Sequence, residues 1–242
     1  MRNIIRQSNK GMYAKYSILG VIISSTLLAG CNELPKPSQE KVSHYEKNFE
    51  IIGAEKERMI GLVNGAIYRS VDRANKTAKP QTISVVPIEG VEISLGTGRY
   101  MITGYPAGNI FIYDENGELI LTEIVGSYAG SGSLTLDIDS SYTVRADGGY
   151  DSVQITPVKT VLATDLTTGL WKVGTDIAPG EYDIEIEEAY GYLQIFEEGK
   201  EPILFELIGG KVGQTNGQVT LKAGQTIRVT DTSFIKFTKS AL

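Results

Sequence analysis

The segment Gly180-Glu181-Tyr182-Asp183-Ile184-Glu185-Ile186-Glu187 alternates acidic and apolar side chains after its first residue. This period of two fits a β-strand with one buried and one solvated face, and no helix accommodates it. The solvated face is predicted to form a candidate binding surface for a cation or a basic envelope protein. Its acidic residues are Glu181, Asp183, Glu185 and Glu187. The simpler interpretation is an edge strand whose charges prevent mispairing.

A related segment, Gly98-Arg99-Tyr100-Met101-Ile102, precedes this one by 82 positions. Further matches follow in the same order: 110–113 with 193–196 and 120–124 with 203–207 at an offset of 83, then 134–136 with 219–221 and Val144 with Val229 at 85. Five ordered matches indicate a duplication. Because each copy is rich in short strands and turns, the sequence predicts a mainly β chain. We expect two tandem antiparallel β-sandwich or small-barrel modules, residues 79–158 and 159–242.

The first copy contains a hairpin signal, since Asn116-Gly117 separates two apolar runs. Asn-Gly favours a type I′ turn, in which both central residues have positive φ. Residues 198–200 occupy the corresponding place in the second copy. Each copy is therefore expected to contain a hairpin here.

The N-terminus carries four basic residues and no acidic residue before position 31, and an apolar run from Ser17 ends in Leu28-Ala29-Gly30-Cys31. These features resemble the signal peptide and lipobox of bacterial lipoprotein precursors. The resemblance implies cleavage between Gly30 and Cys31, removal of residues 1–30, and a diacylglycerol on the Cys31 sulfur. A retained signal anchor is the alternative, although about 20 apolar residues are needed to span a membrane.

A lipid-anchored chain would lie on the extracytoplasmic face of the cell membrane, or on the outer membrane if the cell is Gram-negative. Loss of the four basic groups would lower the formal net charge from −6 to −10. That acidity disfavours nucleic acid as a partner. The membrane, reached through the lipid anchor, and an envelope protein or a glycan are the expected partners.

Between the leader and the duplicated part, two regions differ in composition. Residues 31–42 are predicted to form a polar tether that Pro35 and Pro37 stiffen. Residues 43–78 are predicted to form a helical stalk of two or three segments, because apolar residues recur at helical spacing. Ser43 and Glu46 form a capping-box signature at its start, and a break is expected near Gly61.

The second copy also resembles a repeat of Gram-positive surface proteins. The resemblance rests on Trp171-Lys172-Val173-Gly174-Thr175-Asp176-Ile177-Ala178-Pro179-Gly180-Glu181-Tyr182 and on residues 224–229. It implies a β-rich, surface-displayed accessory module without an established chemistry. The first copy keeps Gly98 and Tyr100 but lacks the other elements of the pattern.

The chain has few residues of the types that catalyse reactions or bind metals. His44 is the only histidine and Cys31 the only cysteine, so no catalytic triad, multi-ligand metal site or cofactor site is predicted. Carboxylates remain, since Asp137 and Asp139 share a predicted strand face. With Asp147 or Asp151 they could approach a cation. Two carboxylates would also suit glycoside hydrolysis, which supports the alternative of a carboxylate-based enzyme acting on carbohydrate or peptidoglycan.

Tyr105 and Tyr190 occupy comparable places between two strands of their copies. An exposed tyrosine combines a broad apolar face with a hydrogen-bonding tip, so both are candidates for stacking on sugars or anchoring a protein. Packing against neighbouring strands is the alternative. The sequence therefore predicts a membrane-anchored lipoprotein that acts as a binding or structural surface module and is not an enzyme. A solute-binding lipoprotein is disfavoured, because no βαβ alternation follows residue 80.

Overall fold

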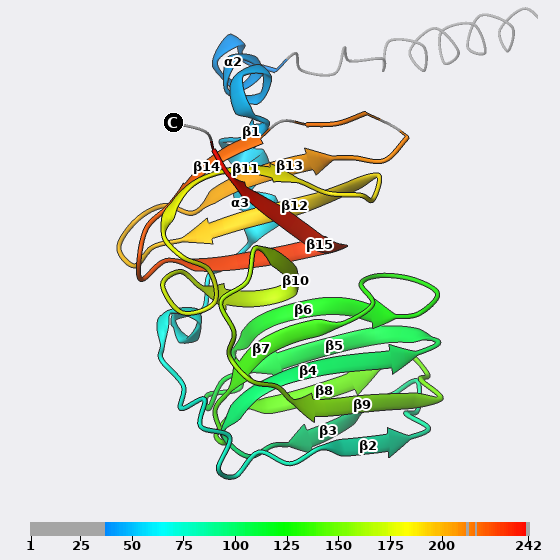
Figure 1. The fold of residues 1–242 in the computed structure, drawn as a ribbon. Coiled ribbons are helices and arrows are strands. Elements are labelled where there is room, and N and C mark those ends of the chain that lie inside the picture. The colour runs from blue at the N-terminus through cyan, green and yellow to red at the C-terminus, as the bar shows by residue number, and fades with distance from the viewer. Residues whose placement is uncertain (1–36, 212, 216, 241–242) are drawn as a thin grey trace, which may run out of the picture. The chain divides into compact units, whose positions relative to one another are not determined.

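The computed structural model describes residues 37–211, 213–215 and 217–240. The predicted signal peptide, the cleavage site and Cys31 lie outside these residues. All the elements below belong to one unit that begins at Gln39. The chain is mainly β, as predicted, and neither sheet closes into a barrel in the described part (Figure 1). No helix within that part is long and apolar enough to cross a membrane.

Residues 79–158, here module 1, form a two-layer sandwich. One layer orders its strands β7-β4-β9-β2, and the other β3-β8-β5-β6. The strands are β2 (Gln81–Ser84), β3 (Val91–Ser94), β4 (Gly98–Tyr105), β5 (Ala107–Tyr113), β6 (Leu119–Gly126), β7 (Leu134–Ile138), β8 (Thr143–Asp147) and β9 (Ser152–Pro157). Their inward side chains, including Tyr100, Ile110 and Val144, make one buried apolar cluster.

Residues 159–242, here module 2, bury a second apolar cluster that includes Leu166, Tyr182 and Leu193. The strands are β10 (Asp165–Lys172), β11 (Gly180–Glu185), β12 (Tyr190–Phe196), β13 (Ile203–Ile208), β14 (Gly217–Leu221) and β15 (Thr226–Lys239). In module 2, the long strands β10 and β15 each pass from one layer into the other. In module 1, two shorter strands take the place of each: β2 and β3 correspond to β10, and β8 and β9 correspond to β15.

The strand pairings of the two modules correspond one to one, which supports the inferred duplication. β4 pairs with β7 and β9 as β11 pairs with β14 and the end of β15, and β5 pairs with β6 and β8 as β12 pairs with β13 and the start of β15. The offset of 85 predicted between β7 and β14 is two residues too large. Gly98 pairs with Ile138, and its counterpart Gly180 pairs with Leu221, so Ile138 corresponds to Leu221 at an offset of 83. The offset predicted for the β6 and β13 segments is one residue too large, because Phe111 faces Thr122 where Gln194 faces Leu204.

The two modules share a sheet. β10 and β7 form a parallel bridge between Gly169 and Thr135, which extends the larger sheet to eleven strands. Gly169 has φ +148°, and a Cβ on it would lie 1.9 Å from the Thr135 carbonyl oxygen. Only glycine permits this backbone approach.

The predicted hairpin is present between β5 and β6, but the predicted turn type is wrong. Gly117 has φ +78°, whereas Asn116 is absent from the residues with positive φ. The turn is organised by Asp114, whose Oδ1 accepts hydrogen bonds from the backbone N–H groups of Asn116 and Glu118, at 2.8 and 2.9 Å. A side chain that binds its own loop therefore favours a turn with one left-handed residue, Gly117, where a type I′ turn needs two.

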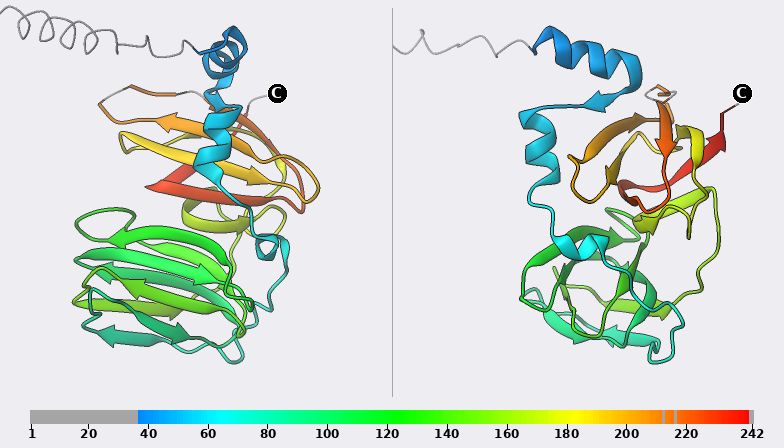
Figure 2. Two further views of the ribbon diagram at one scale, coloured as in Figure 1. Left: turned by 180° about the vertical axis from the view of Figure 1, so that it is seen from behind. Right: turned by 90° about the vertical axis from the view of Figure 1, so that its left-hand side faces the viewer.

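The region predicted as a helical stalk overlaps α2 (Gln39–Asn48), which begins inside the predicted tether, so Ser43 and Glu46 lie within this helix and not at its start. The region also contains α3 (Ala54–Ile60) and the short 3₁₀ helix η1 (Gly65–Tyr68), and residues 69–78 are not helical. α3 ends before Gly61, where the break is expected. Between the helices, β1 (Glu50–Ile51) pairs with β13, so the segment belongs to the sheet of module 2. Figure 2 shows this blue-to-cyan segment running along module 2 towards the junction with module 1.

Candidate functional site

The acidic strand is β11, and its side chains alternate as predicted. Tyr182, Ile184 and Ile186 are buried, and Glu181 and Glu187 are exposed. β11 pairs with β14 on one side and with β15 on the other. The interpretation of this segment as a charged edge strand is therefore wrong.

Partners within module 2 neutralise part of the acidic face. Glu185 forms an ion pair with Lys236 at 3.0 Å and accepts a hydrogen bond from Gln214, also at 3.0 Å. The hydrogen bond with Glu185 raises the pKa of Lys236 above its usual value. Asp183 accepts hydrogen bonds from Gln218 and Ser240. A hollow of about 320 Å³ lies beside Glu185, Glu187 and Lys236, so both signs of charge line it. A purely cationic ligand is not what this surface favours.

Tyr105, at the end of β4, lies in an exposed aromatic pair. Its hydroxyl is 3.2 Å from that of Tyr128, and the two rings meet edge to face with centroids 5.4 Å apart. Tyr105 is 45% exposed and Tyr128 is 76% exposed. The backbone N–H of Tyr128 donates to the carbonyl of Pro106, which joins the loop after β6 to the turn after β4. Two tyrosines from different loops thus lie together, and the sequence indicated only the first.

Tyr190, at the start of β12, is 59% exposed. Its neighbour Gly191 packs so closely on Thr232 that a Cβ would lie 2.6 Å from the threonine Cβ. Thr168 contacts both the carbonyl of Thr232 and the hydroxyl of Ser131, which follows Tyr128 in its loop. The ends of β4 and β6 and the start of β12 lie at the same end of the molecule (Figure 1), and the loop that holds Tyr128 contacts module 2 through Ser131 and Thr168.

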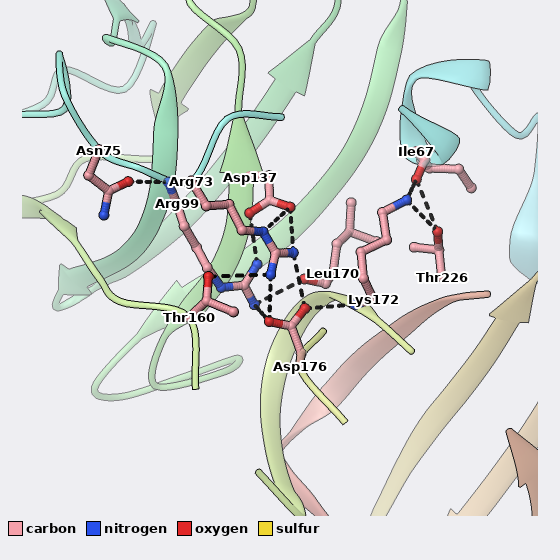
Figure 3. A network of polar contacts seen from close by, with 10 residues as sticks. All are labelled: Ile67, Arg73, Asn75, Arg99, Asp137, Thr160, Leu170, Lys172, Asp176 and Thr226. Atoms are coloured by element: carbon pink, nitrogen blue, oxygen red, sulfur yellow. Dashed lines mark hydrogen bonds and ion pairs between the residues drawn. The ribbon is translucent and has the colours of Figure 1, made fainter. Parts of the chain in front are cut away.

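A buried network of ion pairs joins the two modules (Figure 3). Arg73, in the irregular segment after η1, donates to Asp137 of β7 at 2.6 Å and to Asp176 of module 2 at 2.7 Å. Arg99 of β4 donates to Asp137 at 2.9 Å and lies 3.6 Å from Asp176. The side chains of Arg99 and Asp176 are each 1% exposed. Two arginines and two aspartates therefore balance their charges in the interior, as buried ions require.

Neighbouring groups complete the network. The Arg99 guanidinium lies 4.5 Å from the ring centroid of Trp171, a cation–π arrangement. Burial lowers the pKa of Lys172, whose ammonium donates to the Ile67 carbonyl and to Thr226. Burial by itself would lower the pKa of Arg73, but its hydrogen bonds with the two aspartates raise it. The network therefore links the segment after η1, module 1 and module 2 through charged groups.

This network was missed by sequence reasoning. Asp137 was considered with Asp139 as a cation or catalytic pair, but Asp139 binds Ser141 in its own turn. Asp147 pairs with Arg145, at 3.1 Å. Within the described residues, no group of three or more metal-ligating side chains is found. His44 lies in α2, 3.3 Å from Glu50.

A buried carboxylate, Glu123 of β6, lies on the same junction. It accepts hydrogen bonds from Thr230 of β15, at 2.9 and 3.1 Å, and lies 3.5 Å from the Arg228 guanidinium. Burial raises the pKa of Glu123. The junction therefore combines charge pairing, a shared backbone bridge and a buried acid.

The chain matches no protein-family model and no curated protein sequence.

Proposed function

We propose that this protein is a membrane-anchored extracytoplasmic lipoprotein that binds a glycan through the tyrosines at the junction of its two β-modules. The lipid anchor is argued from the basic leader and the Leu28-Ala29-Gly30-Cys31 lipobox. Two acyl chains on Cys31 would hold the chain stably, whereas a single chain gives only marginal attachment. The tether of residues 31–42 would then lift the β-modules from the lipid surface.

The observation that carries the binding role is the exposed pair Tyr105 and Tyr128. Their mutual hydroxyl contact and the Pro106 hydrogen bond order the rings before any ligand arrives. Preordered aromatic side chains bind at a lower entropic cost than mobile ones. Tyrosine faces stack on the apolar faces of sugar rings, while the hydroxyls bond sugar oxygens.

The charge near this pair narrows the class of ligand. The N–H of Asp151 donates to the Tyr105 carbonyl at 2.8 Å, and its carboxylate helps to raise the pKa of Tyr105, after the larger effects of the Tyr128 hydrogen bond and of burial. A carboxylate here would repel phosphate-rich or uronic polymers and accept hydrogen bonds from sugar hydroxyl or amino groups. A neutral or amino-sugar glycan is the ligand that fits.

The anchor is tested by mass spectrometry of the protein extracted from membranes. The N-terminal peptide should begin at Cys31 and carry lipid. A chain that retains residues 1–30 with an unmodified Cys31 would refute the anchor and leave the binding surface untouched.

The glycan role is tested by calorimetric titration of the full chain with neutral and N-acetylated oligosaccharides. Tyr128→Ala should weaken binding about tenfold, equivalent to about 1.4 kcal/mol, because one stacking face is lost. Tyr113→Ala is the matched control, since Tyr113 stacks on Phe111 away from this pair. Equal losses in both variants, or no binding by the unmodified protein, would contradict the proposal.

A further inference from the structure

The duplication allows the two modules to be compared face by face. In module 1, the outer side of β7 receives module 2 through the bridge from Thr135 to Gly169. The residue that corresponds to Thr135 at the offset of 83 is Gln218 of β14. In module 2, the backbone N–H and carbonyl of Gln218 bond the side-chain amide of Asn48, at 2.8 and 2.7 Å.

The edge strand of the other layer shows the same replacement of a module contact by a contact with residues 48–51. In module 1, the open edge of β6 is covered by module 2, since Arg228 donates to the Thr122 carbonyl at 2.8 Å. The counterpart of Thr122 is Leu204 of β13, and it pairs with Ile51 of β1. The N–H of Glu206 also donates to the Phe49 carbonyl. The segment Asn48–Ile51 thus occupies the face of module 2 that corresponds to the docking face of module 1.

The opposite end of the molecule carries the module 1 counterpart of the surface with which module 2 contacts module 1. The connection between β2 and β3 corresponds to the middle of β10, where Thr168 and Gly169 meet module 1. Within the described residues this connection exposes two large apolar side chains, Val85 at 71% and Ile88 at 79%. Arg145, the counterpart of Arg228, is also partly exposed there and donates to the Glu89 carbonyl.

We propose that Asn48–Ile51 is a displaceable cap, and that the β13–β14 face beneath it binds the β2–β3 end of a second copy of this chain. The contact repeats between chains the junction that module 1 and module 2 make within one chain. Stacked modules need a terminal element that covers the last face, because an uncovered sheet edge is a template for further pairing. The Asn48 amide donates one hydrogen bond and accepts one, as the backbone of a paired strand residue does, and this contact is much smaller than that of a whole module.

The surface that the cap covers differs from the surface that the β2–β3 end presents, so the contact is heterologous. Heterologous contacts that do not close into a ring continue into open assemblies. With the cap in place the protein should be a monomer, and with the cap weakened it should form dimers and longer chains as its concentration rises. The cap would therefore control whether copies of this protein associate on the membrane.

The test uses the full chain with Asn48→Ala and Ile51→Asp, which removes both hydrogen bonds to Gln218 and the buried anchor of β1. Sedimentation velocity and light scattering should show the average mass at least doubling over a concentration series in which the unmodified protein stays monomeric. Adding Ile88→Glu to this variant should restore the monomer. Val161→Glu, at a residue 66% exposed outside the β2–β3 connection, is the matched control and should leave association unchanged.

Several results would overturn the proposal. One is a double variant that keeps its β-type circular dichroism and remains monomeric throughout the series. Another is association that Ile88→Glu and Val161→Glu weaken equally. If the double variant loses its β signal, Asn48→Ala alone replaces it, and a strictly monomeric single variant then rejects the cap.

Discussion

Replacing Asp176 by alanine should weaken the contact between the two modules. Asp176 accepts hydrogen bonds from both terminal nitrogens of Arg73, at 2.7 and 3.0 Å, and from the Lys172 N–H at 2.7 Å. It also lies 3.6 Å from the Arg99 guanidinium. The substitution leaves two arginines with one carboxylate, Asp137, and so creates an uncompensated positive charge in the interior.

The size of the effect follows from burial. Removing one partner of a buried ion pair costs about 3–5 kcal/mol, because the remaining charge stays desolvated. The whole free energy of unfolding of a domain is about 5–15 kcal/mol. Since Asp176 lies in module 2 and its arginine partners lie outside it, we also expect the two modules of the variant to unfold in separate transitions.

The assay is urea unfolding followed in parallel by circular dichroism and by the fluorescence of Trp171, which lies beside Arg99 at the junction. Glu115→Ala is the matched control, because Glu115 pairs with Arg69 at 2.6 and 2.7 Å while both side chains are well exposed. An exposed pair should contribute about 0–1 kcal/mol. A loss below about 1 kcal/mol for Asp176→Ala, or equal losses in both variants, would refute the reasoning.

Three further predictions concern the junction and the acidic face. Gly169→Ala should lower the free energy of unfolding by at least about 1–3 kcal/mol, because its Cβ would collide with the Thr135 carbonyl, and thermal denaturation should show it. Burial raises the pKa of Glu123 above its ordinary value of 4.5. The unfolded chain therefore loses this proton at a lower pH than the folded chain, and the free energy of unfolding falls as pH rises from about 4.5 through the folded pKa. Glu123→Gln should lack this fall, and identical pH profiles of stability for the variant and the unmodified protein would contradict the prediction. Glu185→Ala should change stability by no more than about 1 kcal/mol in urea unfolding, because its pair with Lys236 is exposed, and a larger loss would give the acidic face a structural role.

Local patterns in the sequence were sufficient for the strands and for the duplication. Alternation along 180–187 fixes which side chains of β11 are buried, and ordered matches between the copies predict equivalent strands. The offset of 85 was wrong by two residues because similar apolar residues recur every second position, so both alignments look alike. The offset of the β6 and β13 segments was wrong by one because the β5–β6 hairpin has a register shift after Ile112 that the β12–β13 hairpin lacks. The turn at Asn116 was misread because Asp114, two residues earlier, binds the loop and selects its backbone conformation.

The candidate surface was predicted only in part. Tyr105 and Tyr190 are exposed, and the partner of Tyr105 is Tyr128, from a loop that carries no distinguishing pattern. The acidic residues of β11 were predicted on one face, but Lys236 neutralises Glu185 from β15, and no feature of the sequence places these two side chains together.

By itself, the sequence determined the mainly β class, the paired modules and the solvated face of β11, because a period of two is a local property of the chain. Tertiary structure alone decided how the modules meet. Arg73 binds Asp137 and Asp176, which lie 64 and 103 positions away in the chain. Asn48 binds the backbone of Gln218 in β14, 170 positions away. A charge or an amide at such a separation finds its partner only after the strands have packed, since its environment is set by the fold and not by its neighbours in the chain.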